Sequence, residues 1–244
     1  MSDEHEDVSC ESHGKQAPAV MCRHLLEGSR LGFNYSWDEA EPDVWCPDAW
    51  CDECDKVWTQ AGSFTDEVKE QLDIKVVCAQ CYEELRERNW LQDDARFEHL
   101  LQESIANLED RQARLWDQFR IDECDEYRWD QDTGQLVFSQ GGKPRVTADF
   151  VFVGTISTHS NTWLWSWANS TDAEARKALM RKVRAYGDEH RFMRLATAHW
   201  SGEERDGWQM TAIAAHLLGA AGAYRTPSDH GYNFLIMTCV NWVE

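Results

Sequence analysis

Two Cys-x-x-Cys pairs limit what the front of this chain can fold into. Cys51 and Cys54 form the first pair, and Cys78 and Cys81 form the second after 23 intervening residues. A tight turn brings the two thiolates of a pair to one side of a cation, and two such turns complete a tetrahedral site. The spacing therefore predicts a closed, structural zinc site formed by these four cysteines.

Three more residues of the same segment are candidate ligands. Cys22 and His24 form a Cys-x-His pair, and Cys46 precedes the first Cys-x-x-Cys pair. Two separate tetrahedral sites need eight ligands, whereas two ions that share a bridging thiolate need seven. We expect one zinc ion, with these three residues as candidates for a second site. The alternative is that the extra cysteines are core residues, because a free cysteine packs as a small hydrophobe.

Redox chemistry is the other use of a Cys-x-x-Cys pair. It needs the pair at the start of a helix that follows a strand in a thioredoxin-like βαβ frame. The sequence predicts that context for neither pair, so metal binding is favoured. Cys124 and Cys239 are isolated in the second half of the chain, and we expect them to be core or surface thiols.

The net charge of −20 is concentrated at the front of the chain. Residues 1–99 hold 24 acidic and 9 basic side chains, against 20 and 15 in residues 100–244. Such a surface repels nucleic acid and attracts basic proteins, although a solvated acidic face can also serve solubility alone. The candidate partner-binding residues form a stretch without a basic side chain: Asp38, Glu39, Glu41, Asp43, Asp48, Asp52, Glu53 and Asp55.

Three segments are predicted along the chain. Residues 1–18 form a flexible acidic tail, residues 19–92 a zinc-binding domain and residues 93–244 an α+β domain. The first residues lack the apolar core of a signal peptide, and no run approaches the roughly 18 apolar residues of a membrane span. We therefore expect a cytoplasmic protein that does not enter the membrane.

The second domain alternates little between helix and strand. Apolar residues at steps of three and four between Phe97 and Phe119 predict a long amphipathic helix, and strand-like runs at 126–130, 135–139 and 145–157 predict an antiparallel meander. Thr171 with Glu174 and Ser201 with Glu204 are capping-box patterns that open two further helices, the first closing near residue 187. The apolar run 234–243 is expected to be a buried strand. Segregated helices and strands predict an α+β fold with an antiparallel sheet.

One stretch of the second domain carries a resemblance. VGTISTHSNTWLWSWANSTDAEARKALMRKVRAYG, together with YRWDQDTGQLVFS and HLLGAAGAYRTP, resembles a bacterial domain family of unknown function with a GT…S…TWLWAWAN core. The resemblance covers roughly residues 97–244. It implies an α+β domain and a bacterial source, and it carries no catalytic residues over. The cysteine-rich front is similar to small domains of uncharacterised bacterial proteins.

No catalytic constellation stands out. Trp163, Trp165 and Trp167 could form an aromatic wall, but clustered tryptophans among apolar neighbours favour core packing. His159 lies near two serines without a Gly-x-Ser-x-Gly elbow, and the histidines after it lack catalytic-metal spacing. We therefore expect a binding protein and not an enzyme.

The acidity, the zinc module and the location together favour a toxin-immunity protein. The expected partner is a basic cognate toxin, such as a nuclease delivered by type VI secretion or another contact-dependent route, whose cleft the acidic residues would occupy in place of phosphates. Direct contact with nucleic acid or membrane is not expected. The alternative is a small-molecule-binding protein or hydrolase with a Trp-lined pocket in the second domain. A zinc-ribbon adaptor of nucleic-acid metabolism is disfavoured by the charge.

Overall fold

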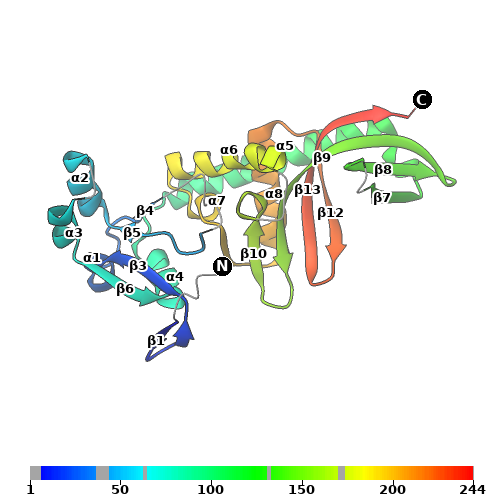
Figure 1. The fold of residues 1–244 in the computed structure, drawn as a ribbon. Coiled ribbons are helices and arrows are strands. Elements are labelled where there is room, and N and C mark those ends of the chain that lie inside the picture. The colour runs from blue at the N-terminus through cyan, green and yellow to red at the C-terminus, as the bar shows by residue number, and fades with distance from the viewer. Residues whose placement is uncertain (1–6, 37–43, 63–64, 131–132, 170–173, 244) are drawn as a thin grey trace. The chain divides into compact units, whose positions relative to one another are not determined.

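The computed structural model describes residues 7–36, 44–62, 65–130, 133–169 and 174–243 (Figure 1). The chain divides into two compact units, an N-terminal unit of residues 1–92 and a C-terminal unit of residues 93–244. The α+β class expected from the sequence is confirmed, with an antiparallel sheet packed against helices in the C-terminal unit.

The strands of the N-terminal unit are short. β1 pairs with β2 in an antiparallel hairpin, and four further strands form a sheet in the order β4-β5-β3-β6. In that sheet β3 and β5 run parallel, and the other neighbours are antiparallel. The strands are β1 (Val8–Cys10), β2 (Gly14–Gln16), β3 (Pro18–Cys22), β4 (Asn34–Tyr35), β5 (Ala49–Trp50) and β6 (Ile74–Cys78).

In the described part of this unit, four helices accompany the sheet: α1 (Arg23–Glu27), α2 (Asp52–Ala61), α3 (Asp66–Leu72) and α4 (Ala79–Asn89). Thr65 caps α3 by accepting a hydrogen bond from the backbone N–H of Val68, and Gly62 ends α2 in the left-handed conformation. The core between helices and sheet is small. Its largest fully buried side chains are Met21, Leu25, Leu72 and Tyr82.

Residues 8–16 differ from the expected flexible tail, because they form the β1–β2 hairpin. Gly14 follows the connecting turn with a φ of 70°, a conformation that glycine adopts without strain. Polar composition alone predicted a tail, but Cys10 and His13 of this hairpin lie beside Cys78 and Cys81. The hairpin is therefore part of the folded unit.

The C-terminal unit is organised by two long strands, β9 (Lys143–Ser157) and β13 (Gly231–Trp242). They pair antiparallel from Val146 opposite Trp242 to Ser157 opposite Gly231. The other edge of the curled β9 pairs first with β8 and then with β10 (Figure 1). The remaining strands are β7 (Glu126–Asp130), β8 (Gln135–Gln140), β10 (Thr162–Trp165), β11 (His199–Ser201) and β12 (Gly222–Ser228). The expected meander is present as β7-β8-β9.

Helices pack against this sheet. α8 (Glu204–Leu218) lies against β9 and β13, and α5 (Asp94–Phe119) packs against α8. A Cβ at Gly207 would lie 2.5 Å from the ring of Phe234, so glycine permits the close approach of α8 to β13. The other helices are α6 (Glu174–His190), α7 (Met193–Ala196) and the 3-10 turns η1 (Ile121–Glu123) and η2 (Ser166–Ala168).

Two helix boundaries differ from the capping patterns. Thr171 lies outside the described residues, and α6 continues past Gly187 to His190. A Cβ at Gly187 would lie 2.6 Å from the Cβ of Leu195, so this glycine serves close packing within the unit and does not end the helix. α8 starts after Glu203, which forms the capping box with Asp206, and Ser201 belongs to β11.

The expectation of core packing for the tryptophan run is confirmed. Trp163 and Trp165 are 0% exposed and Trp167 is 1% exposed. The Trp163 ring is edge-on to Trp165 and also contacts Trp200 and Phe234. The last strand is buried only at residues 234–237, while Trp242 is 45% exposed.

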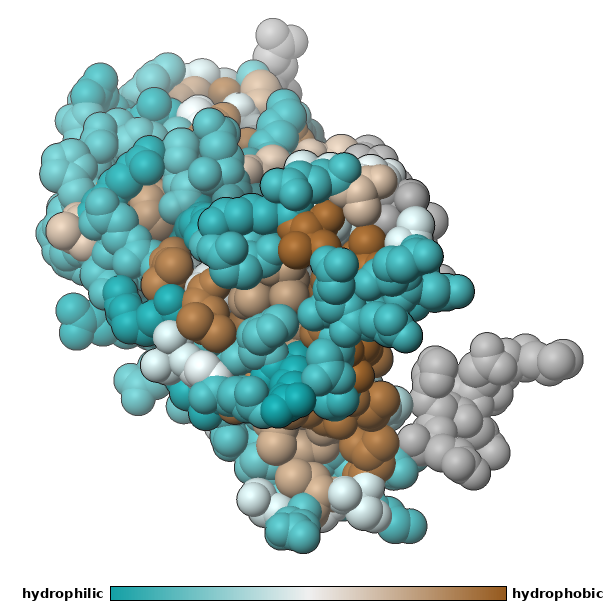
Figure 2. All heavy atoms as spheres, turned by 90° about the vertical axis from the view of Figure 1, so that its left-hand side faces the viewer, coloured by the Kyte–Doolittle hydropathy of each residue, from teal (hydrophilic) through white to brown (hydrophobic). Residues whose placement is uncertain are grey.

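The face drawn in Figure 2 is largely hydrophilic, and apolar residues reach it in small groups between hydrophilic ones. Among the residues that the structure describes, no helix is both long and apolar enough to cross a membrane.

Candidate metal centres

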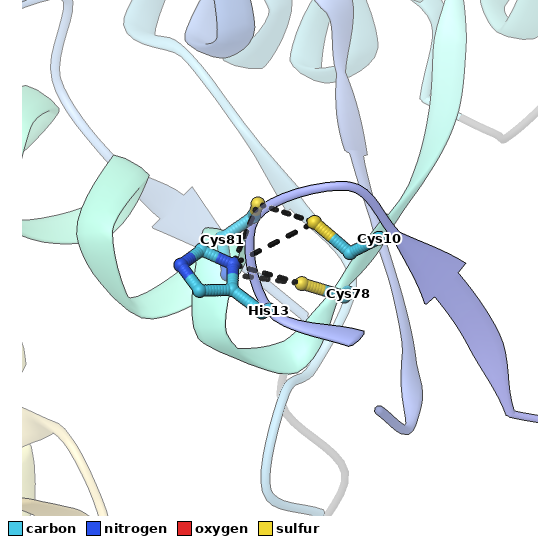
Figure 3. Close-up of side chains that lie close together, drawn as sticks. All are labelled: Cys10, His13, Cys78 and Cys81. Carbon is cyan, nitrogen blue, oxygen red and sulfur yellow. Dashed lines mark hydrogen bonds between the residues drawn. The ribbon is translucent and has the colours of Figure 1, made fainter. Parts of the chain in front are cut away.

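The first centre, the hairpin cluster, consists of Cys10, His13, Cys78 and Cys81 (Figure 3). Cys10 ends β1, and His13 lies in the turn that leads to β2. Cys78 ends β6 and is the N-cap of α4, and Cys81 lies in the first turn of that helix. A hairpin and a strand-to-helix junction thus present two ligands each to a common point.

The spacing of the ligand atoms matches a tetrahedral ion. The Nδ1 atom of His13 lies 3.4 Å from the sulfurs of Cys78 and Cys81 and 3.6 Å from that of Cys10. The sulfurs of Cys10 and Cys81 are 3.7 Å apart. Zn–S bonds of about 2.3 Å and Zn–N bonds of about 2.0 Å imply tetrahedral edges of about 3.8 Å between sulfurs and about 3.5 Å between sulfur and nitrogen. The cluster therefore fits a four-coordinate zinc ion.

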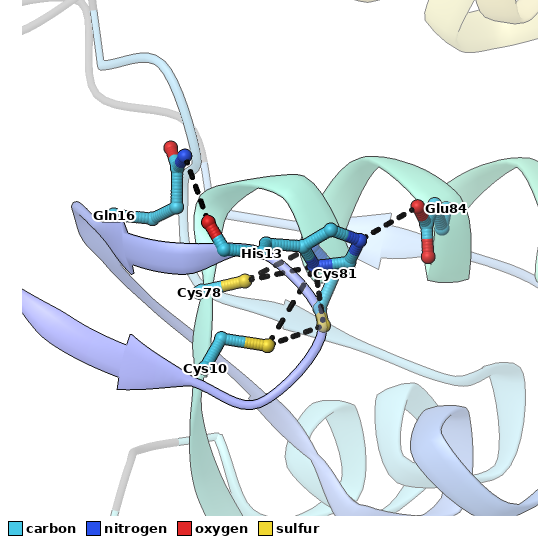
Figure 4. A network of polar contacts seen from close by, with 6 residues as sticks. All are labelled: Cys10, His13, Gln16, Cys78, Cys81 and Glu84. Atoms are coloured by element: carbon cyan, nitrogen blue, oxygen red, sulfur yellow. Dashed lines mark hydrogen bonds and ion pairs between the residues drawn. The ribbon is translucent and has the colours of Figure 1, made fainter.

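The orientation of His13 is set by groups outside the cluster. Its Nε2 atom lies 3.1 Å from Oε1 of Glu84 on α4, and its backbone carbonyl accepts a hydrogen bond from Gln16 (Figure 4). A proton on Nε2, shared with this carboxylate, leaves the Nδ1 lone pair directed at the three sulfurs. This arrangement is the carboxylate–histidine pairing common behind metal-ligating histidines.

The second centre, the inner cluster, consists of Cys22, His24, Cys51 and Cys54. Cys22 ends β3 and precedes α1, whose first turn holds His24. Cys51 follows β5 as the N-cap of α2, and Cys54 lies in the first turn of that helix. All three cysteines are buried and His24 is exposed, so this cluster is part of the small core of the N-terminal unit.

The ligand atoms of the inner cluster also converge, within 4.8 Å of one another. Nδ1 of His24 lies 3.2 Å from the sulfur of Cys54. The backbone N–H of Cys51 donates a hydrogen bond of 3.4 Å to the sulfur of Cys22, as expected of a sulfur that carries negative charge. Three thiols and one imidazole form the same donor set as in the hairpin cluster.

Each cluster already stabilises one thiolate. The pKa of Cys22 is lowered to about 5, mainly because the Cys54 thiol donates a hydrogen bond to it. The pKa of Cys10 is lowered to about 7 by hydrogen bonds from the backbone of His13 and Ser12. By contrast, burial raises the pKa of Cys46 to about 12, so this thiol remains neutral. Burial also raises the pKa of Cys81 to about 12, so Cys46 differs from the cluster cysteines by its position outside both clusters and not by its pKa.

The clusters correct the expected ligand set. The structure does not join the two Cys-x-x-Cys pairs in one four-cysteine site; Cys51 and Cys54 lie with Cys22 and His24, and the other pair lies with Cys10 and His13. Cys46 belongs to neither cluster. Eight candidate ligands are therefore present, enough for two separate sites. The first pair along the chain lies with the last, and the two pairs between them lie together.

Cys10 and His13 are the ligands that the sequence reasoning missed. Their Cys-x-x-His spacing is itself a chelating pattern, comparable to the Cys-x-His pair of Cys22 and His24, and could have identified them. The polar, acidic segment around them predicts a tail instead. The long sequence separation from Cys78 hid their partner.

The structure also changes the argument against redox chemistry. Both Cys-x-x-Cys pairs lie at the start of a helix that follows a strand, a context that the sequence did not predict. Each pair, however, has a further cysteine and a histidine at coordination distance, and a thioredoxin-like pair lacks this. The four-ligand arrangement favours metal binding on direct geometric grounds.

Half of the acidic candidates for partner binding lie within the described residues. Asp38, Glu39, Glu41 and Asp43 lie outside the described residues. Asp48 and Glu53 are exposed, whereas Asp52 and Asp55 are half-buried and engaged in the fold. Asp52 accepts a hydrogen bond from Asn34, and Asp55 accepts one from the indole of Trp50. Asp48 and Glu53 are therefore the described candidates that can face a partner without disturbing the unit, and of these Glu53 pairs with Lys56 at the surface.

Comparison with known proteins identifies a family for the second half of the chain. No curated protein matches this sequence, and no solved structure matches it. Residues 98–239 match the model of a family of unknown function, DUF6882, in the region where the sequence resembles such a family. Because this match covers more than half of the chain, the protein belongs to the DUF6882 family.

Proposed function

We propose that each cluster holds one structural zinc ion. Three thiolates and an imidazole fill a tetrahedral zinc site and leave no position for substrate or water, which is typical of structural and not catalytic zinc. Support comes from the match between the ligand separations of the hairpin cluster and tetrahedral edges. The donor set, rich in soft thiolates, also favours zinc over calcium or magnesium.

We further propose that the protein is an immunity protein that neutralises a basic cognate toxin, such as a nuclease. The observation that carries this proposal is the acidity of the metal-organised N-terminal unit, in which residues 1–92 hold 21 acidic and 8 basic side chains. A site of three thiolates, one imidazole and Zn²⁺ carries a net charge of −1, so the unit stays acidic when metal is bound. A rigid acidic module can occupy a cleft that otherwise binds phosphates.

The alternative function, a Trp-lined pocket in the C-terminal unit, receives little support. Trp163, Trp165 and Trp167 are buried in the core, and none of them lines a described cleft. A cleft of about 350 Å³ lies between α5 and α8, lined by Trp208, Leu108 and Arg205 among others. Its lining includes Glu109 and Arg205 but no histidine, cysteine or serine that would suggest a catalytic group.

Metal content tests the zinc proposal directly. Protein purified without added metal should contain two equivalents of zinc. Cys51→Ser and Cys78→Ser should each remove one equivalent, because each removes a ligand from a different cluster. Cys239→Ser is the matched control, since this exposed thiol lies outside both clusters. Loss of both equivalents in one variant without unfolding, or no zinc in the native chain, would contradict two independent structural sites.

Protection from a toxin tests the immunity proposal. The chain would be co-expressed with a toxin encoded beside its gene, and cell survival measured. Reversal of the two exposed candidates, Asp48→Lys with Glu53→Lys, should slow capture and reduce protection, because exposed charges steer association. The double variant Asp117→Lys with Asp229→Lys changes the net charge equally at exposed positions of the C-terminal unit.

The outcome separates steering by this surface from a general charge effect. Protection that falls equally in both double variants would indicate that only net charge matters. Full protection by the Asp48 and Glu53 variant would remove the acidic N-terminal surface from the proposal. The association rate of the native complex should also fall steeply with ionic strength, because screening shortens the reach of charges to about 8 Å at physiological salt.

A further inference from the structure

A cleft of about 410 Å³ opens on the sheet of the N-terminal unit, and none of the eight candidate metal ligands lines it. Its apolar lining includes Val20 of β3 and Ile74 of β6. These two residues share a face of the sheet, because Ile74 pairs with Cys22, two residues after Val20. The volume falls in the range of about 300–1,000 Å³ typical of ligand sites.

Two tryptophans line the same cleft. Trp50 of β5 and Trp58 of α2 meet edge-to-face, with ring centroids 4.4 Å apart. Trp50 is held in place because its indole N–H donates a hydrogen bond of 2.9 Å to Asp55. Tryptophan rings attract cations through the negative potential of their faces, and they also pack well against aliphatic chains.

Asp48 supplies the charge of the cleft. Its backbone carbonyl accepts a hydrogen bond of 2.8 Å from the N–H of Ser36, which positions the residue beside the β4–β5 pair. Its carboxylate has no hydrogen bond or ion pair within the part of the chain that the structure describes, and partial burial raises its pKa. Asp48 is exposed as a whole residue, and the cleft walls remove only part of the hydration of its carboxylate, which has no counter-ion among the described residues.

Lys69 also lines the cleft, but its charge is already paired. Its ammonium group lies 3.2 Å from the carboxylate of Asp66 on the same helix. Asp48 is thus left as the charged group that a ligand could neutralise. The cleft combines an apolar floor, two indoles and an anionic rim.

We propose that this cleft binds the side chain of a lysine or arginine from a partner protein. Both side chains have a long apolar stem with a cation at its tip. The stem matches Val20, Ile74 and the indoles, and the cation matches Asp48. The inference deepens the proposed function and rests on it, because the basic toxin is the partner that would supply such a side chain.

The test uses the zinc-loaded full chain and three small probes. These are the amides of Nα-acetyl-lysine, Nα-acetyl-arginine and Nα-acetyl-norleucine, of which the last has an aliphatic chain and no cation. NMR signals of the indole N–H groups of Trp50 and Trp58 report binding. The two cationic probes should shift both signals with saturation, and norleucine amide should bind at least about fivefold more weakly because it cannot pair with the carboxylate.

Two matched variants locate the charge effect. Asp48→Asn should weaken lysine-amide binding about tenfold, the scale of one charge-assisted hydrogen bond. Glu53→Gln removes an equal charge from an exposed position on α2 outside the cleft and should change binding less than about twofold. Zinc content of both variants verifies the fold.

The inference is overturned if the cationic probes leave the two indole signals unshifted, if norleucine amide binds as well as lysine amide, or if the two variants weaken binding equally. Its failure differs from that of the proposed function. If the native chain neutralises a toxin, Asp48→Asn protects as well as the native chain, and no probe binds, then the cleft proposal is refuted and the immunity proposal is retained. If the probes bind as expected and no toxin is neutralised, the cleft proposal is retained and the immunity proposal is refuted.

Discussion

The N-terminal and C-terminal units achieve stability in different ways. β4 and β5 of the first unit contain two residues each, whereas β9 and β13 of the second contain 15 and 12. Tyr82 is the largest side chain that the described part of the first unit buries fully, while the second buries three tryptophans at alternate positions of one run. A small core does not offset the conformational entropy of folding, so a unit of this kind needs cross-links or metal.

The two clusters would supply such links, because each joins residues that are far apart in the sequence. The hairpin cluster joins His13 to Cys81 across 68 positions of sequence, and the inner cluster joins His24 to Cys54 across 30. Links across long loops remove more freedom from the unfolded chain than links across short ones, although the dependence is weak. We therefore expect the C-terminal unit to fold by packing alone, and the N-terminal unit to fold only with its ions bound.

Removal of metal should have the largest effect. A structural zinc site of this type contributes an apparent binding free energy of about 10–16 kcal/mol, more than the total stability of a small domain. A strong chelator should unfold the N-terminal unit and leave the C-terminal unit folded. Thermal unfolding followed by circular dichroism and indole NMR should lose one transition and keep the other. Dispersed Trp50 and Trp58 signals in chelator would contradict this dependence.

Truncation of a core side chain in the C-terminal unit should destabilise that unit and leave the N-terminal unit folded. Trp163→Ala removes a fully buried ring that contacts Trp165, Trp200 and Phe234, and should cost about 3–5 kcal/mol. Denaturant unfolding should show the loss in the C-terminal transition alone, with zinc still at two equivalents. Trp242→Ala, at a position 45% exposed, should cost clearly less. Release of zinc by Trp163→Ala would show that the units are not independent.

A smaller change should distinguish the two clusters. Glu84→Gln weakens the partner of His13 and should lower the zinc affinity of the hairpin cluster about tenfold, the lower end for such outer partners because Glu84 is exposed. Competition with a chromophoric chelator would measure this loss. The inner cluster should be unaffected. Glu87→Gln, an exposed residue on the same helix without a described contact, should behave as the native chain. Equal weakening by both variants would assign the effect to charge alone.

The smallest effect is expected at Asp73. Lys75, and then Arg23, lower the pKa of this carboxyl below its usual value. Because the folded pKa lies below the unfolded one, the carboxylate stabilises the fold above the unfolded value of about 3.9, and this contribution is lost as pH falls through the folded value. Asp73→Asn should thus lower the melting temperature slightly at neutral pH and not at all once both forms are protonated.

The choice of asparagine tests charge without backbone strain. Asp73 has a φ of 46°, and asparagine tolerates this left-handed conformation. Addition of salt should reduce the difference between the two chains, because these are exposed ion pairs. A difference that persists at low pH would indicate a contribution other than the carboxylate charge.

Local signals predicted the C-terminal unit well. The helix expected between Phe97 and Phe119 is α5, and the strands of the meander lie within one or two residues of the expected ranges. Two kinds of signal predicted these elements, the periodicity of apolar residues and turn glycines such as Gly141 and Gly142, both at positive φ. Both signals depend only on residues that are close in the sequence. The predicted end of the helix at Gly187 is wrong. This glycine permits close packing against Leu195, a contact that exists only in the folded unit.

The sequence by itself determined the kind of chemistry in this protein: cysteines and histidines at chelating spacings, an acidic front and a tryptophan-rich core. Only the tertiary structure decided which ligand pairs share an ion. Spacing within a pair is a property of a short turn, whereas the partner of each pair depends on the path of the whole chain between them. The sheet brings the end of β6 beside the β1–β2 hairpin, and the end of β3 beside the start of α2. Two clusters of three cysteines and one histidine therefore form where local spacing alone indicated one site of four cysteines.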